Sequence, residues 1–306
     1  MKNIARPPSA PLRIAVVGVG AIGSTFAYHL ARAGHAVTAV ARPGSKRLSQ
    51  LQLQRGVVLK SGERADLRIA DALDEQCAYD LVLVTVLAHQ VAAVLPALQR
   101  SSAAAVQFMF NAFDPDPFAD VVGRRRCSFG MPFVMSRLDD QGKLDTRINP
   151  GQKTLHGDVR WADLFCAAGV PSTFEPEMSL WLRCHVPICI AMESICVAGQ
   201  RRGGGATWSE SRVAARGLHS GFTIVKALGY SLYPASKSRL GSWPVALLAC
   251  MLWAISRVRS FRELLATGLA ECCALADALA AAASNSTPAL ASEANGVLAM
   301  KPSRPD

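Results

Sequence analysis

The sequence predicts an α/β protein, in which an N-terminal doubly wound sheet is followed by an all-helical C-terminal domain. Two observations carry this prediction. In the first half, short and continuously apolar runs alternate with stretches of helical periodicity, a pattern typical of parallel strands covered by helices. After about Glu177 the chain repeats alanine, leucine and arginine at helical periods, with weak strand signals. A chain of 306 residues has room for two such domains.

The first strand is predicted to begin at Leu12, after residues 1–11, whose three prolines predict a flexible arm. The run LRIAVVG is typical of a buried parallel strand. The next segment starts with small residues, continues with apolar residues at helical spacing, and ends at Gly34, a plausible stop signal. A second strand, AVTAVAR, begins at Ala36. Strand, glycine turn, helix and strand within about thirty residues outline a βαβ unit.

Two further strands are predicted in the same half. The run YDLVLVTV, from Tyr79, is continuously apolar after an acidic start, and QVAAVLPALQR, from Gln90, is the helix expected to pack on it. The run AAVQFMFN, from Ala103, is another strand of the same type. These elements predict one doubly wound domain over residues 12–176.

Residues 177–288 are expected to form the helical domain. Its longest apolar run, WPVALLACMLWAIS from Trp243, is shorter than the roughly 20 residues that span a bilayer, and it contains a proline. We therefore expect a buried helix there. Residues 289–306 are rich in alanine, serine and proline and are expected to form a disordered tail.

The formal net charge of +10 is compatible with binding to nucleic acid, an anionic membrane or a phosphorylated ligand. The basic residues are scattered, however, and only Arg124 to Arg126 and the pair Arg201 and Arg202 form runs. No recognised nucleic-acid motif accompanies these runs, and solvated loops explain them more simply. The sequence therefore predicts neither a nucleic-acid partner nor a membrane partner.

The nine cysteines are odd in number and lack the spacing of a disulfide framework. Free thiols in a reducing compartment are the simplest interpretation, so we expect a cytoplasmic protein. Cys184, Cys189 and Cys196 lack the close spacing of zinc ligands, and no metal site is predicted.

Gly18, Gly20 and Gly23 form the pattern G-x-G-x-x-G between the first predicted strand and the first predicted helix. The first glycine allows a tight turn, the second lets the backbone approach a diphosphate, and the third lets helix and strand pack closely. Unpaired N–H groups at the helix N-terminus, around Ala21 and Ile22, would hold the diphosphate. Within a complete βαβ frame, this pattern predicts a Rossmann-type dinucleotide site.

The end of the second strand, VARPGSKR, indicates which dinucleotide is preferred. Sites that prefer NAD place a carboxylate there to hold the ribose hydroxyls, and this segment has none. Arg42, with Lys46 or Arg47 nearby, can instead pair with a 2′-phosphate through charge-assisted hydrogen bonds. The sequence therefore predicts NADPH as the cofactor.

With these elements in place, the chain resembles the ketopantoate reductase family, the NADPH-dependent reductases of 2-dehydropantoate. The resemblance runs from VVGVGAIGS through VARPG, DLVLVTVLAHQ, FNAFDP and LWLRCHVP to CMLWAI and LLATGLAE. It implies a Rossmann domain, a helical domain, and an active site in the cleft between them. It also implies a small carbonyl substrate that bears a carboxylate, and a monomer or homodimer.

The cofactor end of the family pattern is mostly retained. The glycines and Arg42 stand where the family binds NADPH, and Gln90 keeps its place in the loop after the strand. Leu87, however, replaces a lysine of the family. Asn111 matches the family asparagine near the nicotinamide and the substrate, although the glycine that follows it has become Ala112.

The catalytic end departs much further from the family. The family's general-acid lysine is replaced by an arginine in this chain. The asparagines that the family has on the same helix, and its polar residues further along the chain, are replaced as well. In this chain the corresponding positions on one helix are Arg183, Pro187 and Ala191. Cys250 takes the place of the family's substrate-binding serine, Ala254 that of an aspartate, and Arg262 stands at or near the active-site glutamate, so the resemblance implies that Cys250 and Arg262 contact the substrate.

These replacements change the expected chemistry. Reduction of a ketone creates an alkoxide that must be stabilised and protonated, and arginine, with a pKa above about 12, stabilises an oxyanion but donates a proton poorly. His185, close in sequence to Arg183, and His219 are possible replacement acids because histidine titrates near neutrality. Arg183 and Arg262 together would favour a larger or more acidic substrate than pantoate, such as a dicarboxylate.

Two alternative functions remain open on the sequence. One is a reductase of a different carbonyl or imine in specialised metabolism. The other is a catalytically silent protein that binds NADP. A Cys184–His185 nucleophilic pair is disfavoured, because adjacent helical residues point about 100 degrees apart.

Overall fold

The computed structural model describes residues 10–265 and 268–302, so nearly all of the predicted N-terminal arm lies outside the described residues. The chain divides into two compact units. The first contains residues up to Val86, 90–110 and 117–176, and the second contains 87–89, 111–116 and the chain from Glu177 onward. Two short segments from the N-terminal half therefore belong to the second unit.

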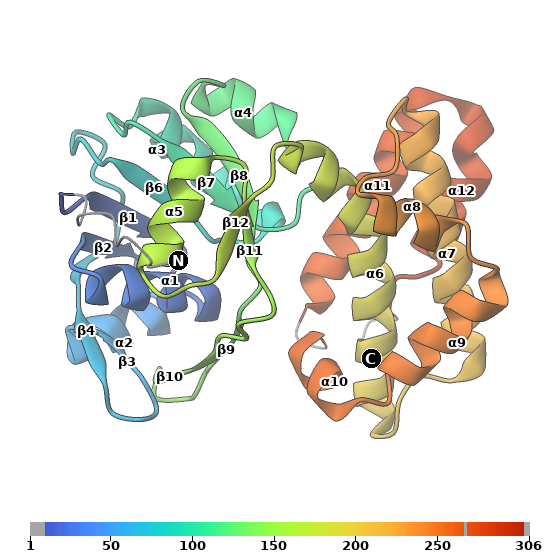
Figure 1. Cartoon of the computed structure of the whole chain (residues 1–306), viewed down its shortest axis with the longest axis horizontal. Coiled ribbons are helices and arrows are strands. Elements are labelled where there is room, and N and C mark those ends of the chain that lie inside the picture. Colours follow the sequence, from blue (N-terminus) through green and yellow to red (C-terminus); the bar gives the residue numbers. More distant parts are fainter. Residues whose placement is uncertain (1–9, 266–267, 303–306) are drawn as a thin grey trace, which may run out of the picture. The chain divides into compact units, whose positions relative to one another are not determined.

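An eight-stranded sheet forms the centre of the first unit, in the order β12-β11-β8-β7-β6-β1-β2-β5 (Figure 1). Neighbouring strands are parallel except β8 and β11. The predicted α/β fold is confirmed, and the runs from Leu12, Tyr79 and Ala103 supply three of the central strands. The strands are β1 (Arg13–Val17), β2 (Ala36–Val40), β5 (Arg68–Ala70), β6 (Leu81–Val84), β7 (Val106–Met109), β8 (Cys127–Met131), β11 (Thr154–His156) and β12 (Ser172–Phe174).

Helices cover the sheet, which is why its central strands are apolar throughout. On one face α1 packs against α5, with the rings of Phe26 and Phe165 edge to face at 4.9 Å. The single helix predicted from Gln90 is instead a 3-10 turn followed by a short helix, because Pro96 lies in the first turn of that helix, where a missing N–H costs little. The helical elements are α1 (Ala21–Arg32), α2 (Lys46–Gln54), η1 (Ala88–Ala93), α3 (Leu95–Arg100), α4 (Asp116–Val122) and α5 (Val159–Ala167).

Two hairpins complete the first unit. One pairs β3 (Gly56–Val58) with β4 (Arg64–Asp66), and the other pairs β9 (Met135–Leu138) with β10 (Leu144–Arg147), both antiparallel. Hydroxyl groups bind the second hairpin to α1, since Thr25 Oγ1 lies 2.7 Å from Ser136 Oγ and 3.2 Å from Thr146 Oγ1. The sequence analysis did not identify these hairpins.

The second unit is helical throughout its described part, as predicted. Its core is built on α6, α7 and α11, and the run from Trp243 forms α9, with Leu248, Ala249 and Leu252 buried. The helix predicted there is therefore buried on one face, whereas Leu247 on its other face is 48% exposed. The helices are α6 (Met178–Arg202), α7 (Trp208–Ala227), α8 (Ala235–Gly241), α9 (Val245–Ile255), α10 (Arg259–Leu265), α11 (Leu269–Ser286), η2 (Pro288–Leu290) and α12 (Ala291–Leu298).

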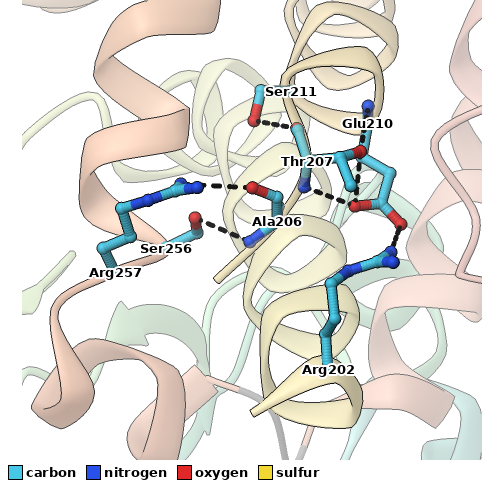
Figure 2. Close-up of polar contacts among 7 residues, drawn as sticks. All are labelled: Arg202, Ala206, Thr207, Glu210, Ser211, Ser256 and Arg257. Atoms are coloured by element: carbon cyan, nitrogen blue, oxygen red, sulfur yellow. Dashed lines mark hydrogen bonds and ion pairs between the residues drawn. The ribbon is translucent and has the colours of Figure 1, made fainter. Parts of the chain in front are cut away.

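The turn between α6 and α7 is held in place from both sides (Figure 2). Thr207 and Glu210 form a capping box at the start of α7, and Arg202 from the end of α6 pairs with the Glu210 carboxylate. The backbone of Ala206 is bound on the opposite side, where its N–H donates to Ser256 Oγ at 2.9 Å and its carbonyl accepts from Arg257 at 3.1 Å.

The predicted disordered tail is wrong for residues 289–302. They form α12 and its flanking turns, with Leu290, Ala294, Val297 and Met300 buried in the core of the second unit. The segment contains serine, asparagine and proline among its alanines, but its apolar residues recur at helical spacing and cover α7 and α11. Residues 303–306 lie outside the described part of the chain.

By length and hydropathy α6 is the one helix of the described chain that could span a membrane, and α8 and α9 pass the same test only as a sharply bent pair. In its most apolar window, 72% of α6 is buried within the structure. Packing in the core of the second unit therefore accounts for its apolar character.

Candidate functional site

The glycine loop between β1 and α1 has the backbone geometry that a diphosphate requires. Gly18 has a φ of +93°, and a Cβ there would lie 2.8 Å from the Val86 nitrogen. A Cβ at Gly23 would lie 2.4 Å from the Gly18 carbonyl oxygen, so α1 can approach β1 this closely only with glycine. Around Gly20, by contrast, no heavy atom lies within 4 Å of the Cβ position. The loop therefore fits a dinucleotide, with the open side at Gly20 and the N-terminus of α1.

Arg47 holds this loop in place. Its Nε donates to the Val19 carbonyl at 2.9 Å, and its two terminal nitrogens donate to Ser24 Oγ at 2.8 Å and the Gly142 carbonyl at 2.9 Å. Burial lowers the pKa of Arg47 to about 10. Since these hydrogen bonds occupy its guanidinium, the expectation that Arg47 could pair with a 2′-phosphate is corrected to a structural role.

Arg42 and Lys46 remain available for a phosphate. Both side chains are exposed, Arg42 after the end of β2 and Lys46 in the first turn of α2, and among the described residues neither makes a hydrogen bond or ion pair. Ala21 and Ile22 lie in the first turn of α1, as predicted. Gln90 is exposed in η1, and its role at the cofactor stays a prediction.

Within the second unit, Asn111 lies among polar side chains from two helices. Its Nδ2 donates to Glu271 Oε1 of α11 at 3.2 Å, and its Oδ1 accepts from Cys189 Sγ of α6 at 3.5 Å. Asn111 is only 7% exposed, so these two contacts fix the orientation of its amide. We call Asn111, Cys189 and Glu271 the amide cluster.

Burial raises the pKa of the Glu271 carboxyl above its ordinary value, while the hydrogen bond from Asn111 and the charge of His89 act in the opposite direction. Burial also raises the pKa of the Cys189 thiol well above its ordinary value, and nearby carboxyls add to this effect. The thiol therefore stays protonated and donates to Asn111. A carboxyl with a raised pKa beside a fixed amide is suited to proton transfer at a carbonyl.

Arg183 is bound to the segment that follows Asn111. Its guanidinium donates to the Phe113 carbonyl at 3.0 Å and to Asp114 Oδ1 at 2.9 Å, and it also pairs with Asp116. The guanidinium carbon lies 4.7 Å from the centre of the Tyr230 ring. Arg183 is 4% exposed. Its geometry is that of an anchor for residues 113–116, and its predicted catalytic role stays a prediction.

The face of α6 that contacts Asn111 differs from the one that the sequence analysis proposed. Pro187 packs against Gly221 of α7, and Ala191 is fully buried in the core of the second unit. Cys189 contacts Asn111 instead. Asn111 therefore meets α6 on the side that carries Cys189, not on the side that carries Pro187 and Ala191.

Two buried or partly buried acidic residues were not predicted from the sequence. Glu271 belongs to the amide cluster, and Glu193, one turn after Cys189 on α6, is buried. A signal was present in the sequence, since Glu193 is the single carboxylate of its helical run and Glu271 lies in a run rich in alanine and leucine, where a charge needs an explanation.

His185 cannot act as the predicted replacement acid. Its ring lies 4.3 Å from that of Trp181, and burial, with a smaller effect from the charge of Lys237, lowers its pKa to about 3. The imidazole is therefore neutral at neutral pH, and the expectation that it titrates there is wrong. His219, the second candidate, is bound through Nε2 to the Trp243 carbonyl at 2.8 Å.

Arg262 does not join Arg183 in a basic site. Its Nη1 donates to the carbonyls of Ser256 and Arg257, and its stem packs near Gly199 of α6. At 1.5 Å per residue, Gly199 lies about 15 Å along α6 from Cys189. The dicarboxylate hypothesis is therefore wrong, because Arg183 is neutralised by its aspartates and Arg262 is bound to backbone elsewhere.

Cys250, predicted to bind substrate, is exposed on α9, and that role stays a prediction. All nine cysteines are free thiols. In the described ranges, no three histidine, cysteine, aspartate or glutamate side chains are grouped so that they could hold a metal ion.

Comparison with known proteins agrees with this geometry. The family model of ketopantoate reductase PanE/ApbA matches residues 14–158, the part of the chain that contains the glycine loop and Asn111. A 2-dehydropantoate 2-reductase of Vibrio cholerae serotype O1 is 29% identical over 199 residues, 58% of this chain. The match covers 62% of that relative's own length.

Solved structures show the same fold. A PanE/ApbA family ketopantoate reductase from Ralstonia eutropha JMP134 superposes with a TM-score of 0.66 at 19% identity, covering 95% of this chain and 98% of the other. A D-mandelate dehydrogenase solved with NADH and anilino(oxo)acetate superposes with a TM-score of 0.63 at 14% identity, covering 95% and 98%.

Proposed function

We propose that this chain, whose residues 14–158 match the family model of ketopantoate reductase PanE/ApbA, uses NADPH to reduce a 2-oxo acid to the 2-hydroxy acid. The acid is ketopantoate or a related compound. The observation that carries the proposal is the contact between Asn111 and the half-buried carboxyl of Glu271, in a chain that also has a dinucleotide-binding glycine loop.

The first unit binds the cofactor in this proposal. The diphosphate is received by the backbone around Gly20 and the N-terminus of α1, and Arg42 with Lys46 pairs with the 2′-phosphate. The absence of a carboxylate at the end of β2 and the free state of these two cations within the described chain support NADPH over NADH. The bound cofactor supplies a hydride to the carbonyl carbon.

The second unit supplies the groups for the carbonyl oxygen. As the carbon accepts the hydride, its oxygen becomes an alkoxide, which the Asn111 Nδ2–H stabilises as a hydrogen-bond donor. Glu271, whose pKa burial raises, is the group that gives a proton to that oxygen and becomes a carboxylate. In this proposal Glu271 takes the place of the family's general acid.

The substrate class follows from the relatives. One is named for 2-dehydropantoate, and another was solved with anilino(oxo)acetate, so both act on or hold acids with an oxo group next to the carboxyl. We expect this chain to accept a member of the same class. We also expect it to work in the cytoplasm, where its free thiols remain reduced.

Glu271→Gln tests the proposal directly. Glutamine keeps an oxygen that accepts from Asn111 but has no acidic proton, so kcat should fall about 10²- to 10⁴-fold while NADPH affinity stays within about twofold. Oxidation of NADPH is measured with ketopantoate and with a panel of aliphatic and aromatic 2-oxo acids. Affinity is measured by titration of the cofactor.

Glu293→Gln, on α12, is the matched control and should leave kcat unchanged. A Glu271→Gln variant with the wild-type kcat would show that Glu271 is not the acid. If the wild-type protein binds NADPH and oxidises it with no 2-oxo acid, aldehyde or imine, it is instead a silent NADP-binding protein.

A further inference from the structure

The amide cluster contains more hydrogen-bond donors than its own contacts use. The Cys189 thiol has one donor, the Asn111 amide has two on Nδ2, and a protonated Glu271 carboxyl has one. Within the cluster, Cys189 Sγ donates to Asn111 Oδ1 at 3.5 Å, and Asn111 Nδ2 donates to Glu271 Oε1 at 3.2 Å. The second N–H of Asn111 and the acidic proton of Glu271 take no part in these two contacts.

These two donors match what the proposed reaction needs. An alkoxide that forms at the substrate carbonyl needs a hydrogen-bond donor and a proton. The N–H can supply the first and the carboxyl the second, because the two side chains that carry them contact each other. The arrangement depends on the orientation of the amide, with its oxygen facing Cys189 and its nitrogen facing Glu271.

The opposite orientation of the amide would withdraw the acid from the substrate. If the amide is turned end for end, Oδ1 faces Glu271 and accepts its acidic proton, while Nδ2 faces the sulfur of Cys189. A protonated carboxyl is compatible with either arrangement, since one of its oxygens accepts and the other donates. Glu271 by itself therefore does not select the productive orientation.

Cys189 allows the amide oxygen to be satisfied without the proton of Glu271. Asn111 is 7% exposed, so Oδ1 needs a donor within the protein, and a buried acceptor left without one is destabilising. Burial raises the pKa of the Cys189 thiol well above its ordinary value, so its proton is present throughout the neutral range. The helix holds the thiol in place, because the next two residues, Ile190 and Ala191, are buried in the core of the second unit.

We propose that Cys189 is a positioning residue for the reaction: by donating to Asn111 Oδ1, it keeps the proton of Glu271 for the substrate oxygen. This inference rests on the proposed function. The thiol stays protonated throughout the cycle, so its task needs no acid–base or redox change at sulfur. Without a donor at position 189, Oδ1 would turn to Glu271 for a partner, and turnover would fall because the acid is diverted to Asn111.

Cys189→Ala and Cys189→Ser separate this task from a purely structural one. Alanine has no donor, so kcat for a 2-oxo acid should fall about 3- to 10-fold, the range that loss of one hydrogen bond gives, with NADPH affinity within about twofold of wild type. Serine keeps a donor and should recover part of that loss. If Cys189 were only a small core residue, alanine would be tolerated better than serine, because a hydroxyl among apolar groups is destabilising without a partner.

Cys196→Ala is the matched control. Cys196 is a buried thiol two turns further along α6, and its loss should leave kcat unchanged. A kcat in Cys189→Ala that equals or exceeds that of Cys189→Ser would mean that the reaction needs no donor at position 189, and it overturns the proposal.

A second measurement does not depend on turnover. A thiol that donates a hydrogen bond has its S–H stretching band at lower frequency than one that does not, and the Raman difference between the wild type and Cys189→Ser isolates the Cys189 band. This band should lie below that of Cys196, which is isolated in the same way with Cys196→Ala and which makes no hydrogen bond within the described part of the chain. A Cys189 band at or above that of Cys196 overturns the proposal. If the band is lowered but no 2-oxo acid is reduced, the proposed function fails while the orientation of the amide by Cys189 stands.

Discussion

Two arginines near the end of β2 show how residues of one type take different roles. Arg47 makes three hydrogen bonds that hold the glycine loop, whereas Arg42 is exposed and free among the described residues. Their sequence context is the same short basic run. Only the contacts of each side chain distinguish the anchor from the candidate phosphate ligand.

Arg42→Ala should therefore alter cofactor choice without altering the fold. A charge-assisted hydrogen bond to the 2′-phosphate contributes about 1.5 to 3 kcal/mol, so KM for NADPH should rise about 10- to 100-fold. The kcat/KM with NADH, which has no 2′-phosphate, should change by less than about threefold. Steady-state kinetics with both cofactors measure the difference.

Arg32→Ala is the matched control for this prediction, since Arg32 is an exposed cation at the far end of α1. It should leave both cofactors unaffected. Equal losses with NADPH and NADH in Arg42→Ala would mean that Arg42 does not recognise the 2′-phosphate.

At the scale of elements, Arg183 fixes the segment 113–116 to α6. A buried guanidinium with two carboxylate partners holds the chain just after Asn111, so it governs how the amide is presented to α11. The same residue corresponds to the family's catalytic lysine in the sequence resemblance. One substitution distinguishes these two roles.

Arg183→Lys restores the family's residue type and removes the planar fork that bonds both aspartates. If Arg183 is an anchor, the free energy of unfolding should fall by about 1 to 3 kcal/mol, because the aspartates are half-exposed and recover some solvation. The kcat should not rise. Urea unfolding and NADPH oxidation measure the two effects.

Arg239→Lys, on α8, serves as the control and should change neither quantity. A gain in kcat in Arg183→Lys would instead identify position 183 as the catalytic one, as the sequence resemblance implies.

The elements that were predicted correctly are those with local signals. The strands at Leu12 and Tyr79 and the glycine loop are set by apolar runs and by backbone requirements within a few residues of each other. The side of α6 that contacts Asn111 is set by packing against α7 and α11. A shift of two residues in register rotates the assigned face by about 200 degrees, so a resemblance with few matched residues cannot fix it.

At the scale of the whole molecule, buried histidines and a buried carboxyl make the free energy of unfolding change with pH in opposite directions. Burial lowers the pKa of both His156 and His185 to about 3, and it raises that of Glu193, with help from Glu271, to about 9. The histidines bind protons more readily in the unfolded chain, at pH values below about 6.5. Glu193 binds its proton more readily in the folded chain, between about pH 4.5 and its raised pKa.

The free energy of unfolding should therefore be greatest near about pH 6.5. Below this pH, the protons that the histidines with lowered pKa values take up on unfolding outweigh those that Glu193 and Glu271 lose, so stability falls as pH falls. Above it, Glu193 makes stability fall by up to about 1.4 kcal/mol per pH unit as pH rises towards its pKa. The buried thiols with raised pKa values act in the same direction at the alkaline end of the range. Urea unfolding from about pH 5 to about pH 9 measures the curve.

Glu193→Gln should flatten the alkaline side of this curve and leave the acidic side in place. A wild-type curve that rises steadily from about pH 6.5 to about pH 9 would contradict the protonated state assigned to Glu193.

The assignment of residues 111–116 to the second unit also affects how this chain can be recombined. A chimera made by joining two relatives at Glu177 respects the obvious boundary between the halves, yet it takes Asp114 and Asp116 from one parent and Arg183 from the other. It divides Asn111 from Glu271 in the same way. An exchange between relatives therefore keeps these contacts intact only if it transfers residues 111–116 together with the C-terminal half.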